Sequence, residues 1–321
     1  MGSETKKICL VGCGNIGRVH AANLSRLAQV FFCSRSRSSA EKFQQEFQGA
    51  GVFDDFDQVL SADQIEALVI ASPPQFHQEQ IVAALRAGKS VLVEKPMCVT
   101  REEIDAIGTV LQAHPDLFLM VAENYYYKPS LALTKQLISQ GWIGRLESVA
   151  VRKCFQQEAA GWKSQYGALL EGGVHFVALI SDIFEAAPQH VEAAFPGCEP
   201  GQTERHSLTR LQYQGGAVAE LEYAWNVPSR TKGTFQHSHI RGAEGRIAFE
   251  SNGIYVWLHS TRKKRLYFPG FKDLMGYRSM SRDFIDCLNH KSRKPYADFC
   301  KARRDLHIIF AAYETQEGLT P

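Results

Sequence analysis

Short apolar runs and segments of helical periodicity follow one another along the first third of the chain. Apolar runs are typical of buried strands, and apolar residues three and four apart are typical of helices. The predicted strands are residues 8–11, 29–34, 52–53, 67–71, 90–93 and 118–122. The predicted helices are residues 16–28, 38–47, 75–87 and 101–113, the last opened by a capping-box pattern of Thr100 and Glu103. This alternation predicts an α/β fold with a doubly wound parallel sheet and helices on both faces.

The second part of the chain has a different pattern, in which strands follow one another directly. Helices are predicted at residues 129–140, 277–289 and 302–318. Strands are predicted at residues 146–155, 191–195, 207–213, 217–225, 234–241, 246–250 and 254–259. Gly215-Gly216 and Asn252-Gly253 are hairpin signals, so this part favours an antiparallel sheet. Because 321 residues is long for a single core, we predict two domains, residues 1–122 and 123–321.

The first predicted strand ends in a glycine motif, G-x-G-x-x-G, formed by Gly12, Gly14 and Gly17. Gly12 would permit the tight turn, Gly14 a close approach of a pyrophosphate, and Gly17 close packing of the following helix. The N-terminus of that helix would direct its N–H groups at the phosphates. The position between a strand and a helix is the context that a dinucleotide-binding motif requires.

The end of the second predicted strand indicates which dinucleotide binds. A carboxylate at this position accepts hydrogen bonds from the adenosine ribose of NAD and repels the 2′-phosphate of NADP. This chain has Ser34, Arg35, Ser36 and Arg37 there, and no carboxylate before Glu41. Hydroxyl and guanidinium groups suit a phosphate, so we predict NADP as the cofactor, with NAD as the alternative.

Two further loops follow predicted strands at the same edge of the sheet. One contains Ser72, Pro73 and Pro74, followed by His77, and the other contains Glu94-Lys95-Pro96. The binding site of a doubly wound sheet lies beyond the carboxyl ends of its strands. These loops and the glycine motif therefore form the predicted cofactor site, and Lys95 is a candidate for a chemical role.

Composition narrows the class of protein. The net charge of +2 implies no strong attraction to nucleic acid or an anionic membrane, and the basic run 262–265 suits a solvated hairpin or strand end. The eight cysteines include no C-x-x-C pair, which favours a reducing compartment. His237 and His239 are on one face of a predicted strand without a nearby carboxylate or cysteine pattern, so we predict no metal site. No signal-peptide pattern or membrane-length apolar run is found, which predicts a cytoplasmic protein.

Several motifs in a fixed order carry a resemblance to a known family. They are GCGNIGRVH at 12–20, SPPQFH at 72–77, EKP at 94–96, AENYYYKP at 122–129, GWIG at 141–144, EGGVH at 171–175 and a C-terminal segment from RDF at 282–284 to AAYE at 311–314. Together they cover nearly the whole chain. The sequence resembles the glucose–fructose oxidoreductase, inositol dehydrogenase and rhizopine catabolism (Gfo/Idh/MocA) family of NAD(P)-dependent oxidoreductases.

The resemblance implies an N-terminal Rossmann domain and a C-terminal α/β domain with an open, mostly antiparallel sheet. Family members interconvert a secondary alcohol and a carbonyl on a sugar, cyclitol or related polyol. Many form homodimers or homotetramers through the open face of the sheet. The EKP lysine, here Lys95, lies near the nicotinamide, often before a cis peptide bond to proline, here Pro96. The family motif also carries Asn15 and Ile16 into the cofactor site.

A second chemical cluster follows in residues 161–175. The family pattern is an aspartate, three residues and a histidine, whereas this chain has Glu171 and His175, and Ala178 replaces a second aspartate. On a helix, residues four apart share a face, so Glu171 could hold and orient His175. Tyr125, Tyr126 and Tyr127 lie beside polar residues in the segment 124–128, and aromatic rings next to polar groups suit sugar binding. The candidate substrate residues are Tyr125, Lys153, Trp162 and Tyr166.

Three functions remain open from the sequence. The first is hydride transfer at a carbinol carbon, with Lys95 and His175 sharing the proton transfer and either one as the base. The second is reduction of a C=N or conjugated double bond, as in biliverdin-reductase-like relatives. The third is a sensor or regulatory subunit that binds NADP without turnover, for which the acid–base groups would have no use.

Overall fold

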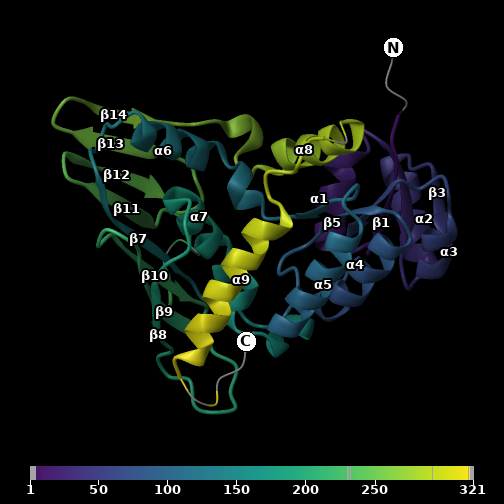
Figure 1. Ribbon diagram of the computed structural model, residues 1–321, viewed down its shortest axis with the longest axis horizontal. Helices are drawn as coiled ribbons and strands as arrows, with labels where there is room; N and C mark the ends of the chain where they lie inside the picture. Colours follow the sequence, from purple (N-terminus) through teal and green to yellow (C-terminus); the bar gives the residue numbers. More distant parts are fainter. Residues whose placement is uncertain (1–4, 230, 232, 291, 317, 319–321) are drawn as a thin grey trace. The chain divides into compact units, whose positions relative to one another are not determined.

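The computed structural model describes residues 5–229, 231, 233–290, 292–316 and 318 (Figure 1). The chain divides into two compact units. The first unit contains Met1–Glu123 and Tyr277–Arg303, and the second contains Asn124–Gly276 and Arg304–Pro321. A late segment of the chain therefore belongs to the first unit, whereas the sequence predicts a single boundary after residue 122.

The first unit is built on a six-stranded sheet in the order β3-β2-β1-β4-β5-β6. The strands are β1 (Lys7–Val11), β2 (Gln29–Cys33), β3 (Gly51–Phe53), β4 (Ala67–Ile70), β5 (Ser90–Val93) and β6 (Leu119–Val121). All neighbouring strands are parallel, as predicted. The strand order reverses between β1 and β4, and a doubly wound sheet binds its ligand at such a reversal.

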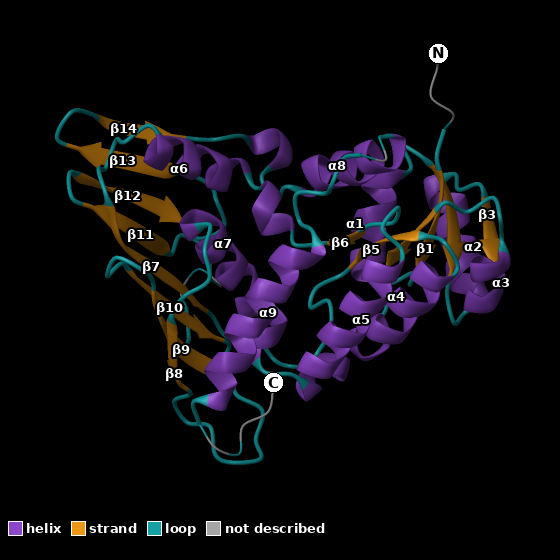
Figure 2. Cartoon of the chain, in the orientation of Figure 1, coloured by secondary structure: helices purple, strands orange, loops and turns teal. Residues whose placement is uncertain are grey.

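Helices cover both faces of this sheet (Figure 2). They are α1 (Asn15–Leu24), α2 (Arg37–Phe47), α3 (Phe56–Ser61), α4 (His77–Arg86), α5 (Arg101–Ala113), α8 (Tyr277–Asn289) and the start of α9 (Phe299–Glu314). Helix α1 packs against α2 and α8, and α4 packs against α5. The predicted capping box of Thr100 and Glu103 is present at α5. The short α3 was not predicted, although Asp55 caps it by accepting a hydrogen bond from the Gln58 backbone N–H.

The second unit contains an eight-stranded sheet in the order β14-β13-β12-β11-β7-β10-β9-β8. The strands are β7 (Leu146–Cys154), β8 (His190–Ala194), β9 (His206–Gln212), β10 (Val218–Ala224), β11 (His237–Gly242), β12 (Gly245–Glu250), β13 (Val256–Ser260) and β14 (Lys264–Tyr267). Every neighbouring pair is antiparallel except β7 and β10. The prediction of a mostly antiparallel sheet is therefore confirmed.

One face of this sheet is covered by α6 (Pro129–Ser139), α7 (Val174–Phe184) and the part of α9 from Arg304 onward, whereas the other face is open (Figure 2). The burial pattern along the strands follows this arrangement, because exposed and buried residues alternate on β9 and β11. Short helical turns connect the elements of both units. They are 3₁₀ turns at Pro74–Phe76, Asn124–Tyr127, Gly161–Gln165 and Phe271–Asp273, and a π-helical turn at Leu169–Gly173.

The strand predicted from residue 234 begins only at His237, because Phe235 has a φ of 55° and its side chain is 60% exposed. The alternation therefore does not extend to Phe235.

The basic run 262–265 lies on a hairpin, since β13 and β14 pair antiparallel around it. Among the described residues, no helix is both long and apolar enough to cross a membrane.

Candidate functional site

The glycine motif forms the turn between β1 and α1 in the first unit. Gly12 has a φ of +108°, and a Cβ there would lie 2.6 Å from the carbonyl oxygen of Ala71. A Cβ at Gly17 would overlap the carbonyl oxygen of Gly12. A Cβ at Gly14 would meet no described atom within 4 Å, so this position faces open space. Gly12 and Gly17 are thus required by packing, whereas Gly14 leaves room for a group outside the fold.

His77 connects the loops that follow β4 and β5. Its ring is fully buried, with Nδ1 2.8 Å from the carbonyl oxygen of Pro96 and Nε2 2.8 Å from that of Ser72. Burial lowers the pKa of the imidazole, against the effect of these two carbonyls. The Ser72 hydroxyl donates to Gln80 Oε1 at 2.5 Å. His77 therefore holds the predicted cofactor loops to each other, and its direct contact with a cofactor stays a prediction.

Glu94 and Lys95 follow β5 directly. The Glu94 side chain is buried, with Oε1 2.7 Å from Nε2 of His20 on α1 and Oε2 3.2 Å from the Lys95 backbone N–H, which donates to it. Burial alone would raise the pKa of Glu94, but the His20 hydrogen bond and the charges of His20 and Lys95 hold it below its ordinary value. The peptide bond between Lys95 and Pro96 is cis. A buried polar pair thus fixes the backbone from which the Lys95 side chain extends.

The segment after β2 contains the predicted 2′-phosphate residues. Arg37 is committed to two carboxylates, with Nε 2.9 Å from Glu41 Oε1 and a second ion pair to Asp54. Arg35 is exposed and makes no hydrogen bond or ion pair with the described part of the chain. Ser34 is half-buried and Ser36 exposed. Of the two arginines, Arg35 is the one whose guanidinium remains available to a ligand.

These features fit a dinucleotide. Helix α1 begins at Asn15 without an acidic residue in its first turn, so its N-terminal N–H groups and positive dipole end are not neutralised there. Gly14 and Asn15 are exposed and Ile16 is half-buried at this helix start. An anion can therefore approach the helix N-terminus beside Gly14, and a nicotinamide dinucleotide would supply the hydride chemistry when bound.

The second unit brings together two of the predicted site residues, Tyr125 and His175. Their rings are stacked, with centroids 4.7 Å apart and an interplanar angle of 15°. The ammonium group of Lys128 lies 3.9 Å from the Tyr125 ring centroid. Tyr125 is only 6% exposed, so its ring supports His175, and its contact with a substrate stays a prediction. Tyr126 is also buried and donates a hydrogen bond to Asp305.

Glu171 lies in the π-helical turn that precedes α7, whereas His175 lies in α7 itself. The change of helix type between them alters the simple four-residue spacing on which the prediction relied. Glu171 is buried and forms an ion pair with Lys163, with Oε1 2.7 Å from Nζ. Trp162 and Tyr166 come from the same segment, with ring centroids 6.3 Å apart. Lys163, Trp162 and Tyr166 thus gather on the segment that leads into Glu171.

Lys153 lies on the helix-covered face of the sheet. Its ammonium donates to the carbonyl oxygen of Gly233 at 2.6 Å and to Oδ1 of Asn252 at 2.8 Å. Burial lowers the pKa of Lys153, against the charge of Glu250. Lys128 donates to the backbone carbonyl of Asn252 at 2.6 Å. The Asn252 turn therefore fixes two lysines, and a substrate role of Lys153 stays a prediction.

Several of these contacts were not predicted from the sequence. Lys163 is eight positions before Glu171, and Lys128 and Asn252 are far apart along the chain, so no periodicity connects them. Asp182, four residues after Ala178, is buried and pairs with Lys135 at 2.9 Å. Asp182 therefore has a structural partner on α6.

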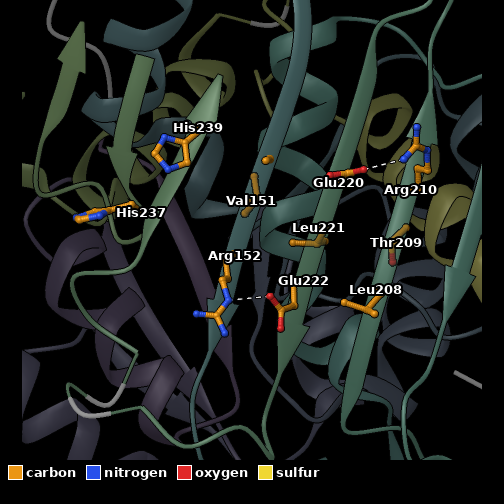
Figure 3. A pocket seen from close by; sticks show the side chains of 11 residues that line it. Val151, Arg152, Leu208, Thr209, Arg210, Glu220, Leu221, Glu222, His237 and His239 are labelled. Atoms are coloured by element: carbon orange, nitrogen blue, oxygen red, sulfur yellow. Dashed lines mark hydrogen bonds and ion pairs between the residues drawn. The ribbon is translucent and has the colours of Figure 1, made fainter. Parts of the chain in front are cut away.

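A pocket of about 530 Å³ lies on the open face of the second sheet (Figure 3). Its charged side chains form ion pairs, Arg152 with Glu222 at 2.7 Å and Arg210 with Glu220 at 2.8 Å. The lining residues are Ala150, Val151, Arg152, Leu208, Thr209, Arg210, Glu220, Leu221, Glu222, His237 and His239. This is the face opposite α7, which carries His175. His237 contacts the Tyr255 hydroxyl, and in the described part of the chain no three His, Cys, Asp or Glu residues are grouped as metal ligands.

Sequence comparison agrees with this architecture. Residues 6–122 match the family model described as an oxidoreductase family with an NAD-binding Rossmann fold. Residues 131–248 match the model of the GFO/IDH/MocA C-terminal domain. The two matches cover the glycine motif, the EKP lysine, and the segment from Trp162 to His175.

Individual proteins are also similar. Glucose-6-phosphate 3-dehydrogenase of Bacillus subtilis is 30% identical over 194 residues, which cover 56% of this chain and 54% of the relative. The chain thus spans about half the length of this curated relative. Levoglucosan dehydrogenase in complex with NADH and levoglucosan has a TM-score of 0.86 at 20% identity, with 97% of each chain covered. KijD10, a 3-ketoreductase from Actinomadura kijaniata in complex with NADP and TDP-benzene, has a TM-score of 0.83 at 21% identity, with 97% of this chain and 98% of that chain covered. These two likenesses concern the fold.

Proposed function

The chain belongs to the GFO/IDH/MocA oxidoreductase family, and from that premise we propose that it transfers a hydride between a nicotinamide cofactor and a secondary alcohol or carbonyl of a sugar, cyclitol or related polyol. The substrate class is supported by the relatives, which include a glucose-6-phosphate 3-dehydrogenase. The observation that carries the proposal is the anchoring of the backbone at Lys95, through Glu94, to the helix that begins at the glycine motif. His20 on α1 holds the carboxylate of Glu94, the residue directly before Lys95.

Lys95 and His175 are assigned the proton transfer. In the oxidation direction, the hydroxyl proton must leave as the hydride leaves the carbinol carbon, so one group accepts the proton and the other stabilises the developing alkoxide. The stacking of His175 on Tyr125 supports this role, because the ring is held in one plane. Glu171 is assigned to the same cluster, where Lys163 provides an opposite charge 2.7 Å from the buried carboxyl group.

NADP is the proposed cofactor, with NAD as the alternative. Ser34, Arg35 and Ser36 would receive the 2′-phosphate, and two carboxylates of this region, Glu41 and Asp54, are occupied by their ion pairs with Arg37. The pyrophosphate would lie at Gly12, Gly14, Asn15, Ile16 and Gly17. The loops Ser72-Pro73-Pro74 and Glu94-Lys95, held by His77, would contact the nicotinamide half.

The proposed substrate residues are Trp162, Tyr166, Tyr125 and Lys153. Trp162 is half-buried and so has ring surface free to stack on the C–H face of a sugar, whereas Tyr166 is buried against it. Tyr125 is held by its contact with the Lys128 ammonium group, and Lys153 by its hydrogen bond to Asn252. Both would shape the site from behind the substrate.

The test is turnover of a panel of polyols, sugar phosphates and carbonyl compounds with NADP and with NAD. Turnover is measured by the change in absorbance of the reduced cofactor. We expect reduction of NADP with at least one polyol and binding of NADP by isothermal titration. Binding without any turnover would favour a sensor, and turnover confined to C=N or conjugated double-bond substrates would favour the second reductase class.

A second copy of the chain is the partner proposed for the open face of the eight-stranded sheet. Leu208 is exposed on this face, and the charged side chains around it form ion pairs with one another. A second copy can therefore cover the face without leaving these charges unpaired. A homodimer formed here, or a homotetramer built from such dimers, leaves the helix-covered face of each sheet unchanged.

A further inference from the structure

We infer that Glu204 and Arg205 are positioning residues for the reaction: together they clamp the segment Ser164–Leu169 and thereby set the position of Glu171 and His175. The inference rests on the proposed function, because it assigns these two residues to the same chemistry. Their hydrogen bonds to this part of the chain go to the backbone of residues 164–169, so they act on the site through that segment.

The clamp consists of four hydrogen bonds from two consecutive residues. The Arg205 guanidinium donates to the carbonyl oxygens of Ser164 and Tyr166 at 3.1 and 2.9 Å. The Glu204 carbonyl accepts from the Ala168 N–H at 3.1 Å, and Glu204 Oε1 accepts from the Leu169 N–H at 2.6 Å. The four bonds follow one another along the segment, so its path is fixed at both ends.

The clamp ends where the helical turn with Glu171 begins. Leu169 is the first residue of the π-helical turn, and its N–H is one of the donors that a helix start leaves without an intrahelical partner. Glu204 Oε1 satisfies that donor and places a carboxyl group at the helix start. Because Glu171 and His175 follow on the same continuous helical segment, a shift of Leu169 would shift both side chains.

The base of the clamp is fixed to the sheet. The Arg205 carbonyl accepts from the Trp225 N–H at 2.8 Å, and the Arg205 guanidinium lies 5.6 Å from the Trp225 ring centroid. Tyr313 donates its hydroxyl to Glu204 Oε1 at 2.7 Å, and its ring stacks on Phe195 at 5.2 Å. The helix start is thus tied through Glu204 to both the sheet and α9.

Gly167 shows how closely the clamp approaches the segment. A Cβ on Gly167 would overlap the Tyr313 hydroxyl and would lie 2.5 Å from Glu204 Oε1. Glu204 itself is 1% exposed, and its other oxygen, Oε2, has no hydrogen-bond partner among the described residues. Burial raises the pKa of Glu204 against the hydrogen bonds from Leu169 and Tyr313. Burial of a carboxyl group with one unpaired oxygen costs free energy. We expect such a group where it fixes the position of a neighbouring segment.

The test compares Glu204→Leu, Glu204→Gln, Arg205→Lys and Tyr313→Phe with the exposed control Glu199→Gln, whose carboxyl lies in the same loop. We expect Glu204→Leu to lower kcat about 100-fold, because a displacement of about 1 Å of a reacting group can have this effect. The Kd for NADP, which binds the other unit in our proposal, stays unchanged. Glu204→Gln restores most of kcat, since the amide oxygen can accept both hydrogen bonds.

Hydrogen exchange of the peptide containing residues 164–175 gives a readout independent of activity. We expect faster exchange at Ala168 and Leu169 in Glu204→Leu, with an intermediate effect in Tyr313→Phe, which keeps the ring stack and loses only the hydroxyl. If Glu204→Leu does not fold, Tyr313→Phe and Arg205→Lys carry the test. A kcat and exchange rate equal to those of Glu199→Gln would overturn the clamp. Faster exchange in a chain without any turnover would support the clamp and reject the proposed function.

Discussion

His20 Nε2 lies 2.7 Å from Glu94 Oε1, and both side chains are almost completely buried. The two residues are 74 positions apart, and the contact joins α1 to the end of β5, one residue before Lys95. A buried carboxylate needs such a partner, because an unpaired charge away from water is costly. The pair therefore connects the helix that begins at the glycine motif to the backbone that carries the proposed catalytic lysine.

Replacement of His20 by alanine should weaken both stability and turnover. Loss of the imidazole leaves the buried Glu94 carboxylate without its side-chain partner. We therefore expect a decrease of ~1–3 kcal/mol in the free energy of unfolding, measured by urea denaturation. His20→Gln is the matched control, because its amide N–H can still donate. Since the pKa of Glu94 is lowered in the fold, the stabilisation is present above the ordinary glutamate pKa and is lost as pH falls through the lowered value. Equal unfolding curves for His20→Ala and His20→Gln would contradict a stabilising hydrogen bond between His20 and Glu94.

Lys95→Met should abolish most of the turnover without weakening cofactor binding. A positioned proton-transfer group contributes about 10²–10⁴-fold to the rate, so kcat should decrease by that factor while the Kd for NADP remains within about twofold. The control is Lys272→Met, which removes an exposed lysine of the second unit. Near-normal kcat in Lys95→Met would remove this residue from the mechanism and leave His175 as the candidate base.

Arg35 and Arg37 should differ in their effect on cofactor choice. Arg35→Ala removes the arginine without described ion pairs and should raise the Kd for NADP about 10- to 100-fold, as expected for a charge-assisted hydrogen bond, with little change for NAD. Arg37→Ala removes a guanidinium already committed to Glu41 and Asp54 and should have a smaller effect on NADP. Fluorescence titration with both nucleotides distinguishes these outcomes, and equal effects of the two substitutions would reject Arg35 as the 2′-phosphate ligand.

Asp305 should make stability depend on pH in the second unit. Burial raises its pKa from 3.8 to about 6, against the Arg304 charge and the Tyr126 hydrogen bond. A raised carboxyl pKa favours the folded state at low pH, and this contribution is present below 3.8 and lost as pH rises through about 6. The difference in the free energy of unfolding between Asp305→Asn and the parent, measured by urea denaturation, should therefore move in favour of the variant from about pH 4 to about pH 7, by at most ~3 kcal/mol. The exposed Asp116→Asn should show no such trend.

Leu208→Asp should dissociate the proposed dimer. Leu208 is 42% exposed and lines the pocket on the open face, so a charge there would have to be buried when a second copy covers it. Light scattering should give the mass of a dimer or tetramer for the parent and of a monomer for the variant. Phe271→Asp, at an apolar residue that is 70% exposed and outside this pocket, is the control. A parent protein of monomer mass would reject the proposal.

Much of the first unit followed from the sequence, because its signals are local. The apolar run that ends at Val11 and the three glycines behind it depend on neighbours along the chain, and the structure gives them the expected strand, turn and helix. The capping box at Thr100 is equally local, since its partner is three residues away. Parallel pairing then followed from alternation, because a strand, a helix and a strand return to the same sheet edge.

Contacts between distant segments could not be read in this way. His20 with Glu94, Lys163 with Glu171, and the Glu204–Arg205 clamp join residues whose separation carries no period. Each forms because folding brings together groups that must be paired once they leave water. The π-helical turn before α7 was also hidden, since the sequence of Glu171 and His175 is equally compatible with a regular helix.

The sequence by itself determined the family, the parallel sheet with its glycine motif, and the lysine that follows β5, because strand periodicity and turn glycines act over a few residues. Tertiary structure alone decided which polar groups are paired: that Arg37 is occupied while Arg35 is not, that Tyr125 is buried behind His175, and that Glu204 holds the helix start. The physical reason is that burial and pairing depend on what lies across space, and a chain of residues specifies this only after it has folded.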